Sequence, residues 1–102
     1  MKLSTILLEN KDNIIVLSIN RESSLNALNK DVFDDLDTFF NVGHLEYPNL
    51  KGVIITGVGT KAFAAGADIK EFMEYSVEEA QALSKRGHDV FKAIENFHAP
   101  VI

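Results

Sequence analysis

The chain has 102 residues, of which 46% are hydrophobic and 25% are charged, and its formal net charge is −5. This length suits one domain or a piece of a larger one, and the near-average composition excludes a disordered chain, a collagen and a coiled-coil rod. Because there is no cysteine, disulfides, cysteine-ligated zinc, iron–sulfur clusters and thiol nucleophiles are excluded. The 15 acidic residues outnumber the 10 basic ones, and without a basic stripe nucleic-acid binding is not expected.

The hydropathy pattern gives no sign of a membrane segment or a leader. Apolar runs such as Ile14–Leu17 are far too short to cross a bilayer. The first residues carry one lysine and a short apolar patch, but charged residues follow at Glu9, Lys11 and Asp12 without a cleavage-site pattern. The sequence therefore predicts a soluble, cytoplasmic protein.

The first elements in chain order are two predicted strands. Thr5–Glu9 and Ile14–Ile19 are rich in isoleucine, valine and leucine, and Asn10–Asn13 between them has the composition of a turn. An antiparallel hairpin is the simplest arrangement of these segments. Asn20–Leu28 is polar and lacks a period, which indicates a loop.

A helix is predicted next, with Asn29 as its N-cap and Gly43 as its C-cap. The acidic cluster Asp31–Asp37 is assigned to the polar face of this helix, because its members do not converge as calcium ligands do. Apolar residues at spacings of three and four define the opposite face, namely Val32, Phe33, Leu36, Phe39 and Phe40.

The second half begins with a strand at Val53–Thr56, where the absence of alternation predicts cover on both faces. A short helix is expected around Asp68–Glu74. Ser76 and Glu79 then form a capping-box pattern that opens a long helix. The expected core positions of that helix are Ala80, Leu83 or Ser84, Gly87, Phe91, Ile94 and Phe97.

The last residues, Ala99–Ile102, have the composition of the start of another strand. A chain that stops within a strand is predicted to be the front part of a longer protein, and the alternative is a short terminal strand at a sheet edge.

Small residues make Ala64–Asp68 the most informative segment for function. The run follows the predicted strand and leads into a helix, where the first N–H groups lack intrahelical partners and can bind an anion or a carbonyl oxygen. The alternative is that small residues let this loop pack beneath a neighbouring helix. Physical chemistry alone leaves both interpretations open.

Four stretches of the sequence resemble one known family. Lys61–Glu71 closely resembles the signature of the enoyl-CoA hydratase/isomerase (crotonase) family. Leu17–Arg21 and Ser24–Asn29 are similar to its early asparagine–arginine–proline and leucine–asparagine–alanine–leucine stretches, and His98–Ile102 is similar to the start of its next buried strand. The chain departs from the family at Glu22, where proline is common, which loosens a loop near the ligand without touching a reacting group.

The resemblance implies an α/β fold in which strand–helix (ββα) units wind into a spiral. Residues 1–102 would form the N-terminal part of this acyl-CoA domain and leave the spiral incomplete. The implied reaction is the syn addition of water to a trans-2-enoyl-CoA, with the thioester oxygen held by two backbone N–H groups. The first donor would be Ala67, whereas the second donor and the two catalytic glutamates would lie beyond Ile102. The 102 residues alone are therefore expected to be inactive.

The resemblance also implies the contacts and the assembly. No cofactor or metal is expected apart from coenzyme A as part of the substrate, and the full-length protein would be a homo-trimer or homo-hexamer. The coenzyme A contacts are expected at Asn26, Ala27, Leu28, Ala65, Gly66, Asp68, Ile69 and Lys70.

Several alternatives share the same residues. Other reactions of the family, such as isomerisation or hydrolysis of CoA thioesters, use the same oxygen pocket, and a non-catalytic acyl-CoA-binding relative would share it too. A remote alternative is a dinucleotide-binding domain, because Gly57–Ala62 matches the glycine fingerprint in its alanine-ended form. However, the position about 20 residues further on opens a helix instead of ending a strand.

The remaining polar candidates are expected to be structural. The three histidines lack metal-ligand spacing, the serines at positions 23 and 24 lack a nucleophile-elbow motif, and the glutamates near predicted helix starts suit the helix dipole. These residues are His44, His88, His98, Ser23, Ser24, Glu71, Glu74, Glu78 and Glu79.

Overall fold

The computed structural model describes residues 2–60, 62–64, 66, 71 and 73–102. Its sheet contains β1 (Ile6–Lys11), β2 (Ile14–Ile19) and β3 (Gly52–Gly57), in that order. β1 pairs with β2 in antiparallel fashion, and β2 pairs with β3 in parallel. A parallel pair needs a crossover connection, and here helix α1 (Lys30–Asn41) supplies it. The second long helix, α3, spans Val77–Glu95.

The predicted hairpin is present, but its turn is shorter than expected. The strands extend toward each other to Lys11 and Ile14, which leaves Asp12 and Asn13 as the two turn residues. Their φ angles of 54° and 69° lie in the left-handed region. Aspartate and asparagine tolerate this region, and it gives a two-residue turn the twist of the flanking strands. The prediction of a four-residue turn was wrong for this reason.

Helix α1 begins as predicted, because the Asn29 side chain accepts a hydrogen bond from the Val32 N–H at 3.0 Å. The predicted apolar stripe is confirmed, since all five of its members are buried. The C-terminal cap is Val42 instead of Gly43, which begins the 3-10 helix η2 (Gly43–Glu46).

One member of the predicted polar face of α1 is buried. Asp35 is only 7% exposed, and its Oδ2 atom accepts hydrogen bonds from the N–H groups of Ser4 and Thr5, at 3.1 and 2.7 Å, and from Thr5 Oγ1 at 2.6 Å. The prediction that the whole acidic cluster faces solvent was therefore wrong at this residue. Asp35 joins the chain before β1 to the middle of α1, a contact that helical periodicity does not reveal.

Helix α3 has both hydrogen bonds of the predicted capping box. Ser76 Oγ accepts from the Glu79 N–H at 3.1 Å, and Glu79 Oε1 accepts from the Ser76 N–H at 3.2 Å. The buried residues of this helix are Leu83, Gly87 and Val90. Phe91, predicted to be in the core, is 51% exposed and places its ring edge-on to Phe33 with centroids 5.9 Å apart.

Replacing Ser76 with alanine in the full-length protein is expected to lower the free energy of unfolding by about 1 kcal/mol, because the Glu79 N–H at the start of α3 loses its side-chain acceptor. Urea denaturation measures the change. The matched control is Ser84→Ala on the exposed face of the same helix, which removes a hydroxyl without a capping role. Equal losses in the two variants would contradict the capping role.

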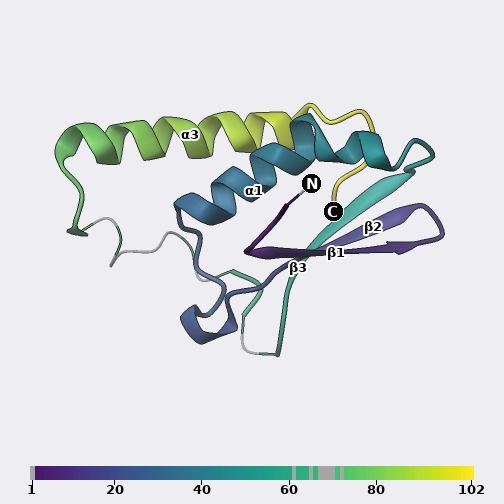
Figure 1. Cartoon of the computed structure of the whole chain (residues 1–102), viewed down its shortest axis with the longest axis horizontal. Coiled ribbons are helices and arrows are strands. Elements are labelled where there is room, and N and C mark those ends of the chain that lie inside the picture. The colour runs from purple at the N-terminus through teal and green to yellow at the C-terminus, as the bar shows by residue number, and fades with distance from the viewer. Residues whose placement is uncertain (1, 61, 65, 67–70, 72) are drawn as a thin grey trace.

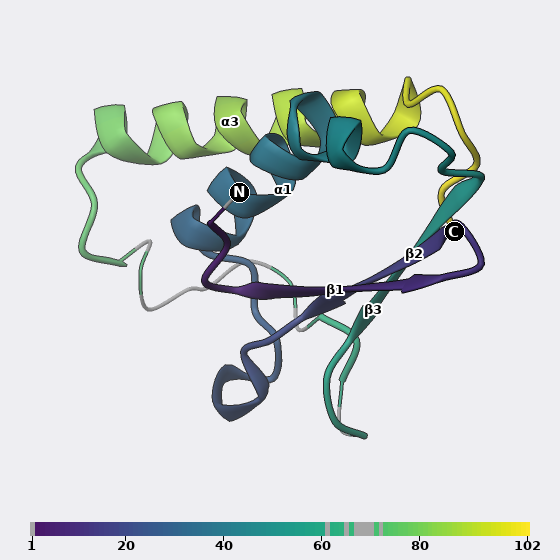
Figure 2. The same cartoon turned by 45° about the vertical axis from the view of Figure 1, so that its right-hand side comes forward.

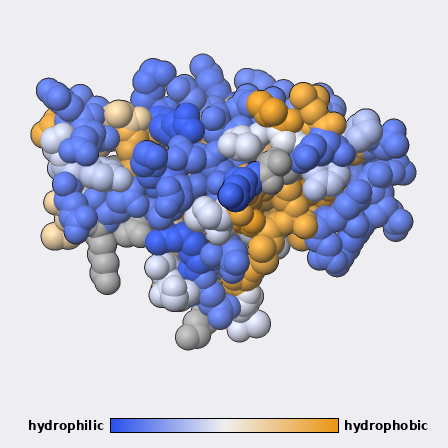
Figure 3. Space-filling view, viewed as in Figure 1, coloured by the Kyte–Doolittle hydropathy of each residue, from blue (hydrophilic) through white to orange (hydrophobic). Residues whose placement is uncertain are grey.

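The helices lie on one side of the sheet, with α1 between the strands and α3 (Figures 1 and 2). The core lies between this face and α1, where Ile15, Leu17 and Phe39 have no exposed surface. The opposite face is open. Ile54 on β3 is 40% exposed, so within residues 1–102 the prediction of a strand covered on both faces was wrong. Figure 3 shows a mostly hydrophilic molecule with an apolar region over the strands.

The last residues pair with the free edge of β3. Val101 forms a parallel bridge to Val53, the Ile102 N–H donates to Val53 O at 2.9 Å, and the Ile55 N–H donates to Ile102 O at 2.8 Å. This pairing agrees with the predicted strand start at Ala99–Ile102. Among the described residues, no helix is both long and apolar enough to cross a membrane.

An aromatic cluster connects η2 to the end of α3. The His44 ring lies 5.0 Å from the Phe97 ring and 5.4 Å from the His98 ring, measured between centroids. Burial lowers the pKa of His44 below its ordinary value, and the neighbouring His98 lowers that pKa further. His44 is thus half-buried within η2, which agrees with the expectation that it is structural.

Because the lowered pKa favours neutral His44 in the folded state, the unfolded chain binds more protons near pH 6. The stability of the full-length protein is therefore expected to fall as the pH drops below about 6.5. His44→Gln should make that decline shallower in urea denaturation series at pH 7 and 5. The matched control is His88→Gln, because His88 is an exposed residue of α3. If His44→Gln left the decline of stability between pH 7 and pH 5 unchanged, His44 would not be the residue responsible for it.

Candidate functional site

The candidate site lies where the two parallel strands end. Ile19 and Gly57 are the last residues of β2 and β3 and are paired in register. The Val58 N–H donates to Ile19 O at 2.9 Å, so the two following loops start side by side. These loops contain residues 20–28 and the glycine-rich and small-residue segment from 58 to 66. Both occupy the lower part of the view in Figure 1.

The loop after β2 is folded around Arg21. A short 3-10 helix, η1 (Glu22–Ser24), follows this residue, and Leu25 and Asn26 have left-handed φ angles of 54° and 57°. The Arg21 guanidinium donates to the main-chain oxygen of Ala27, which holds the backbone of residues 26–28 in place. Leu25 is exposed, whereas Asn26 and Ala27 are buried.

The side chain of Asn26 connects three segments. It is 1% exposed, and its Oδ1 accepts from the Arg21 N–H at 2.9 Å. Its Nδ2 donates to Val58 O at 3.1 Å and to Ala62 O at 2.7 Å. The Asn26 amide is thus engaged inside the protein, while the predicted coenzyme A contact of this residue stays a prediction.

A second connection joins the loop to the small-residue run. The Leu28 N–H donates to Gly66 O at 2.6 Å. Gly66 is exposed and has a φ of +94°, and among the described residues no heavy atom lies within 4 Å of the place where a Cβ would stand. The backbone at Gly66 is open to close approach, which favours the ligand interpretation over packing beneath a helix at this position.

The other predicted site residues are not described. Ala67, predicted to supply the N–H donor, and the predicted coenzyme A contacts Ala65 and Asp68 lie outside the described residues, as do Ile69 and Lys70. The short helix predicted around Asp68–Glu74 lies partly there too, although the described residues 71 and 73 are helical.

Two glycines shape the turn between β3 and the small-residue run. At Gly57 a Cβ would meet Phe63 O, Asn26 Nδ2 and Ala62 O, so a side chain has no room. At Gly59, with a φ of +80°, a Cβ would overlap the Glu22 carboxylate. The Glu22 side chain thus contacts the turn after β3. This contact is made at the position where the family commonly has proline. A hollow of about 260 Å³ lies beside the turn, lined by Thr56, Gly57, Gly59, Thr60, Ala62 and Phe63.

The dinucleotide interpretation of the glycines is wrong. Among the described residues after β3, no helix starts at the glycine motif, and Val77 begins α3 where a second strand should end. The glycines serve the close contacts with Asn26 and Glu22 instead.

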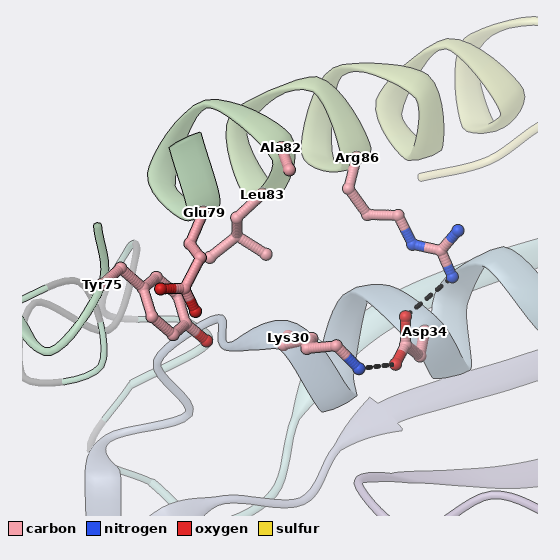
Figure 4. A pocket seen from close by; sticks show the side chains of 7 residues that line it. All are labelled: Lys30, Asp34, Tyr75, Glu79, Ala82, Leu83 and Arg86. Carbon is pink, nitrogen blue, oxygen red and sulfur yellow. Dashed lines mark hydrogen bonds and ion pairs between the residues drawn. The ribbon is translucent and has the colours of Figure 1, made fainter. Parts of the chain in front are cut away.

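A groove of about 340 Å³ lies between α1 and α3 (Figure 4). Lys30 Nζ and Arg86 Nη2 both bond to Asp34, at 2.9 and 2.7 Å. Burial alone would raise the pKa of Asp34, but the hydrogen bonds from these two cations outweigh it and lower that pKa. The bond to Asp34 also raises the pKa of Lys30. Both cations are therefore already paired with a carboxylate.

Two of the glutamates have structural contacts. Glu71 Oε1 accepts from the Lys30 N–H at 3.0 Å, at the start of α1, and from the Tyr75 hydroxyl. This bond raises the pKa of Tyr75 to about 12, so Tyr75 stays protonated near neutral pH. Glu79 belongs to the capping box. Both contacts agree with the expectation that these carboxylates are structural.

The described residues contain no cluster of three or more histidine, aspartate or glutamate side chains arranged to hold a metal ion. The long-range connections made by Asn26, Asp35 and Glu71, of which the first two are buried, were not predicted from the sequence. The only local signal was the polar Asn26 in the loop after β2, and the partners of all three side chains lie 30 or more residues away in the chain.

The family assignment follows from comparison with known proteins. Residues 9–102 match the family model described as enoyl-CoA hydratase/isomerase. The chain is 38% identical over its whole length to the short-chain-enoyl-CoA hydratase of Clostridium acetobutylicum and to the crotonyl-CoA hydratase of Syntrophomonas wolfei. The chain belongs to the enoyl-CoA hydratase/isomerase family. It spans 39% of the length of each of these two relatives.

Solved structures agree with this assignment. The enoyl-CoA hydratase of Bacillus anthracis is similar over 96% of this chain and 38% of its own, with a TM-score of 0.89 and 28% identity. The enoyl-CoA hydratase of Mycobacterium smegmatis gives a TM-score of 0.86 and 31% identity over the same shares of the two chains. The predicted α/β crotonase fold, incomplete in these residues, is therefore confirmed.

Proposed function

We propose that residues 1–102 are the N-terminal part of an enzyme that adds water to a trans-2-enoyl-CoA. The main evidence for this proposal is that the whole chain is 38% identical to each of two hydratases. Two further observations support it: the loops after β2 and β3 are held together, and the backbone at Gly66 is open next to position 67.

In the proposed reaction the substrate's thioester oxygen accepts a hydrogen bond from the Ala67 N–H and from a second N–H beyond Ile102. Water oxygen bonds to C3 of the enoyl group as a carboxylate beyond Ile102 takes one proton from the water. A carboxylic acid, also beyond Ile102, delivers a proton to C2, so that the C2–C3 double bond becomes a single bond. As the double bond is attacked, negative charge develops on the thioester oxygen. A donor aimed at this charge contributes on the order of 3 kcal/mol to transition-state stabilisation.

The coenzyme A part of the substrate is proposed to lie against two segments. One is the loop at Asn26, Ala27 and Leu28, and the other is the run containing Ala65, Gly66, Asp68, Ile69 and Lys70. No separate cofactor or metal is part of this proposal. The full-length protein is proposed to form a homo-trimer or homo-hexamer in the cytoplasm.

The test uses the full-length protein and crotonyl-CoA. Hydration removes the absorbance of the conjugated thioester and yields a product heavier by one water in mass spectrometry. Binding of coenzyme A without turnover would indicate a non-catalytic acyl-CoA-binding relative. Double-bond migration without added water would indicate an isomerase, and release of free coenzyme A a hydrolase. Residues 1–102 expressed alone should show no turnover.

A further inference from the structure

We propose that Asn26 is a positioning residue, whose side-chain amide holds the backbone at Val58 and Ala62, which leads into the small-residue run, against the loop after β2. The inference rests on the proposed function, because the distance between the loop after β2 and the small-residue run matters only if a substrate contacts both. Asn26 acts through the backbone at Ala62 and does not itself touch the reacting atoms.

The hydrogen bonds of the Asn26 side chain carry the proposal. A carboxamide has two N–H donors, and here Nδ2 contacts the carbonyl oxygens of Val58 and Ala62, on both sides of the turn after β3. Its oxygen accepts from the Arg21 N–H at 2.9 Å, on the same loop as Asn26 itself. Asn26 is 1% exposed, so its amide is a buried hydrogen-bonded connection between the loops after β2 and β3.

The surrounding backbone is shaped to admit this amide. Gly57 is the last residue of β3, and its lack of a side chain leaves room for the amide. A Cβ at position 57 would lie 2.5 Å from Asn26 Nδ2. Ala62 lies five residues before Ala67 and four before Gly66, whose carbonyl accepts from the Leu28 N–H. Asn26 therefore joins the backbone that leads into the run, at Ala62, and Leu28 joins the run itself, at Gly66.

Aspartate at position 26 has nearly the same shape but cannot donate. It would place a carboxylate oxygen against the carbonyl oxygens of Val58 and Ala62, where the amide now lies 3.1 and 2.7 Å away. Repulsion should separate the loops and weaken the Leu28–Gly66 hydrogen bond. A misplacement of about 1 Å in a bound substrate costs up to 10²-fold in rate.

The experiment compares Asn26→Asp with the wild-type full-length protein. We expect kcat for crotonyl-CoA to fall about 10- to 100-fold in the folded variant. The Leu28 amide should exchange its hydrogen at least about tenfold faster, while strand amides such as Ile15 are unchanged. The matched control is Asn10→Asp, the same chemical change at an exposed residue near the end of β1, where Oδ1 accepts a bond from the Asn13 N–H in the hairpin turn. It should behave as wild type.

A purely structural role would lower the amount of folded enzyme but leave kcat per folded molecule and the exchange of the Leu28 amide unchanged. That result overturns the proposal. If the Asp variant does not fold, Asn26→Ser removes the amide without adding charge and should give the same pattern. A wild-type protein without turnover contradicts the proposed function, whereas the exchange readout still tests Asn26.

Discussion

Replacing Ala67 with proline in the full-length protein is expected to lower kcat/KM for crotonyl-CoA by about 10²- to 10³-fold. Proline has no N–H, so the thioester oxygen would lose one of its two proposed donors. Charge develops on this oxygen mainly in the transition state, and the loss should therefore appear in kcat more than in KM. Steady-state kinetics with the conjugated thioester measures it.

Two comparisons separate the N–H from other effects of the substitution. Ala67→Gly removes only the methyl group and should keep kcat within a few-fold of wild type. An ester in place of the peptide bond at position 67 removes the same N–H without a proline ring, and should reproduce the loss. A folded proline or ester variant with wild-type kcat would contradict the assignment of Ala67 as donor.

The sequence predicted the elements whose causes are local. Asn29, Ser76 and Glu79 cap helices through hydrogen bonds spanning three residues, and the apolar stripe of α1 follows helical periodicity. The hairpin follows from two β-rich runs around turn residues. The resemblance to the family added the identity of the fold, because its four stretches are spread along the chain between Leu17 and Ile102.

What the sequence did not reveal depends on distant partners. Asp35 contacts Thr5 across 30 residues, and Asn26 contacts Ala62 across 36. No periodicity distinguishes a buried carboxylate from a solvated one on the same helix, or an amide that holds loops together from one that binds a ligand. Phe91 shows the converse, since the α3 stripe predicted burial, yet α1 covers only the side formed by Leu83, Gly87 and Val90.

Replacing Asp35 with alanine is expected to destabilise the full-length protein by about 3 kcal/mol. The variant leaves three donors on Ser4 and Thr5 without their acceptor, and Thr5 is itself buried. Urea denaturation followed by circular dichroism measures the loss. Asp35→Asn keeps one oxygen that can accept from the same donors, so its loss should be smaller, at about 1 kcal/mol.

The control for charge and helix propensity is Asp31→Ala in the first turn of the same helix, where the side chain is exposed. That variant loses only a favourable interaction with the helix dipole, worth at most about 1 kcal/mol. The difference between the two alanine variants therefore measures the buried contact with Ser4 and Thr5. If both variants lost the same stability, the bonds to Ser4 and Thr5 would contribute nothing beyond those they make with water when unfolded. The segment before β1 would then be held by apolar contacts such as those of Leu3.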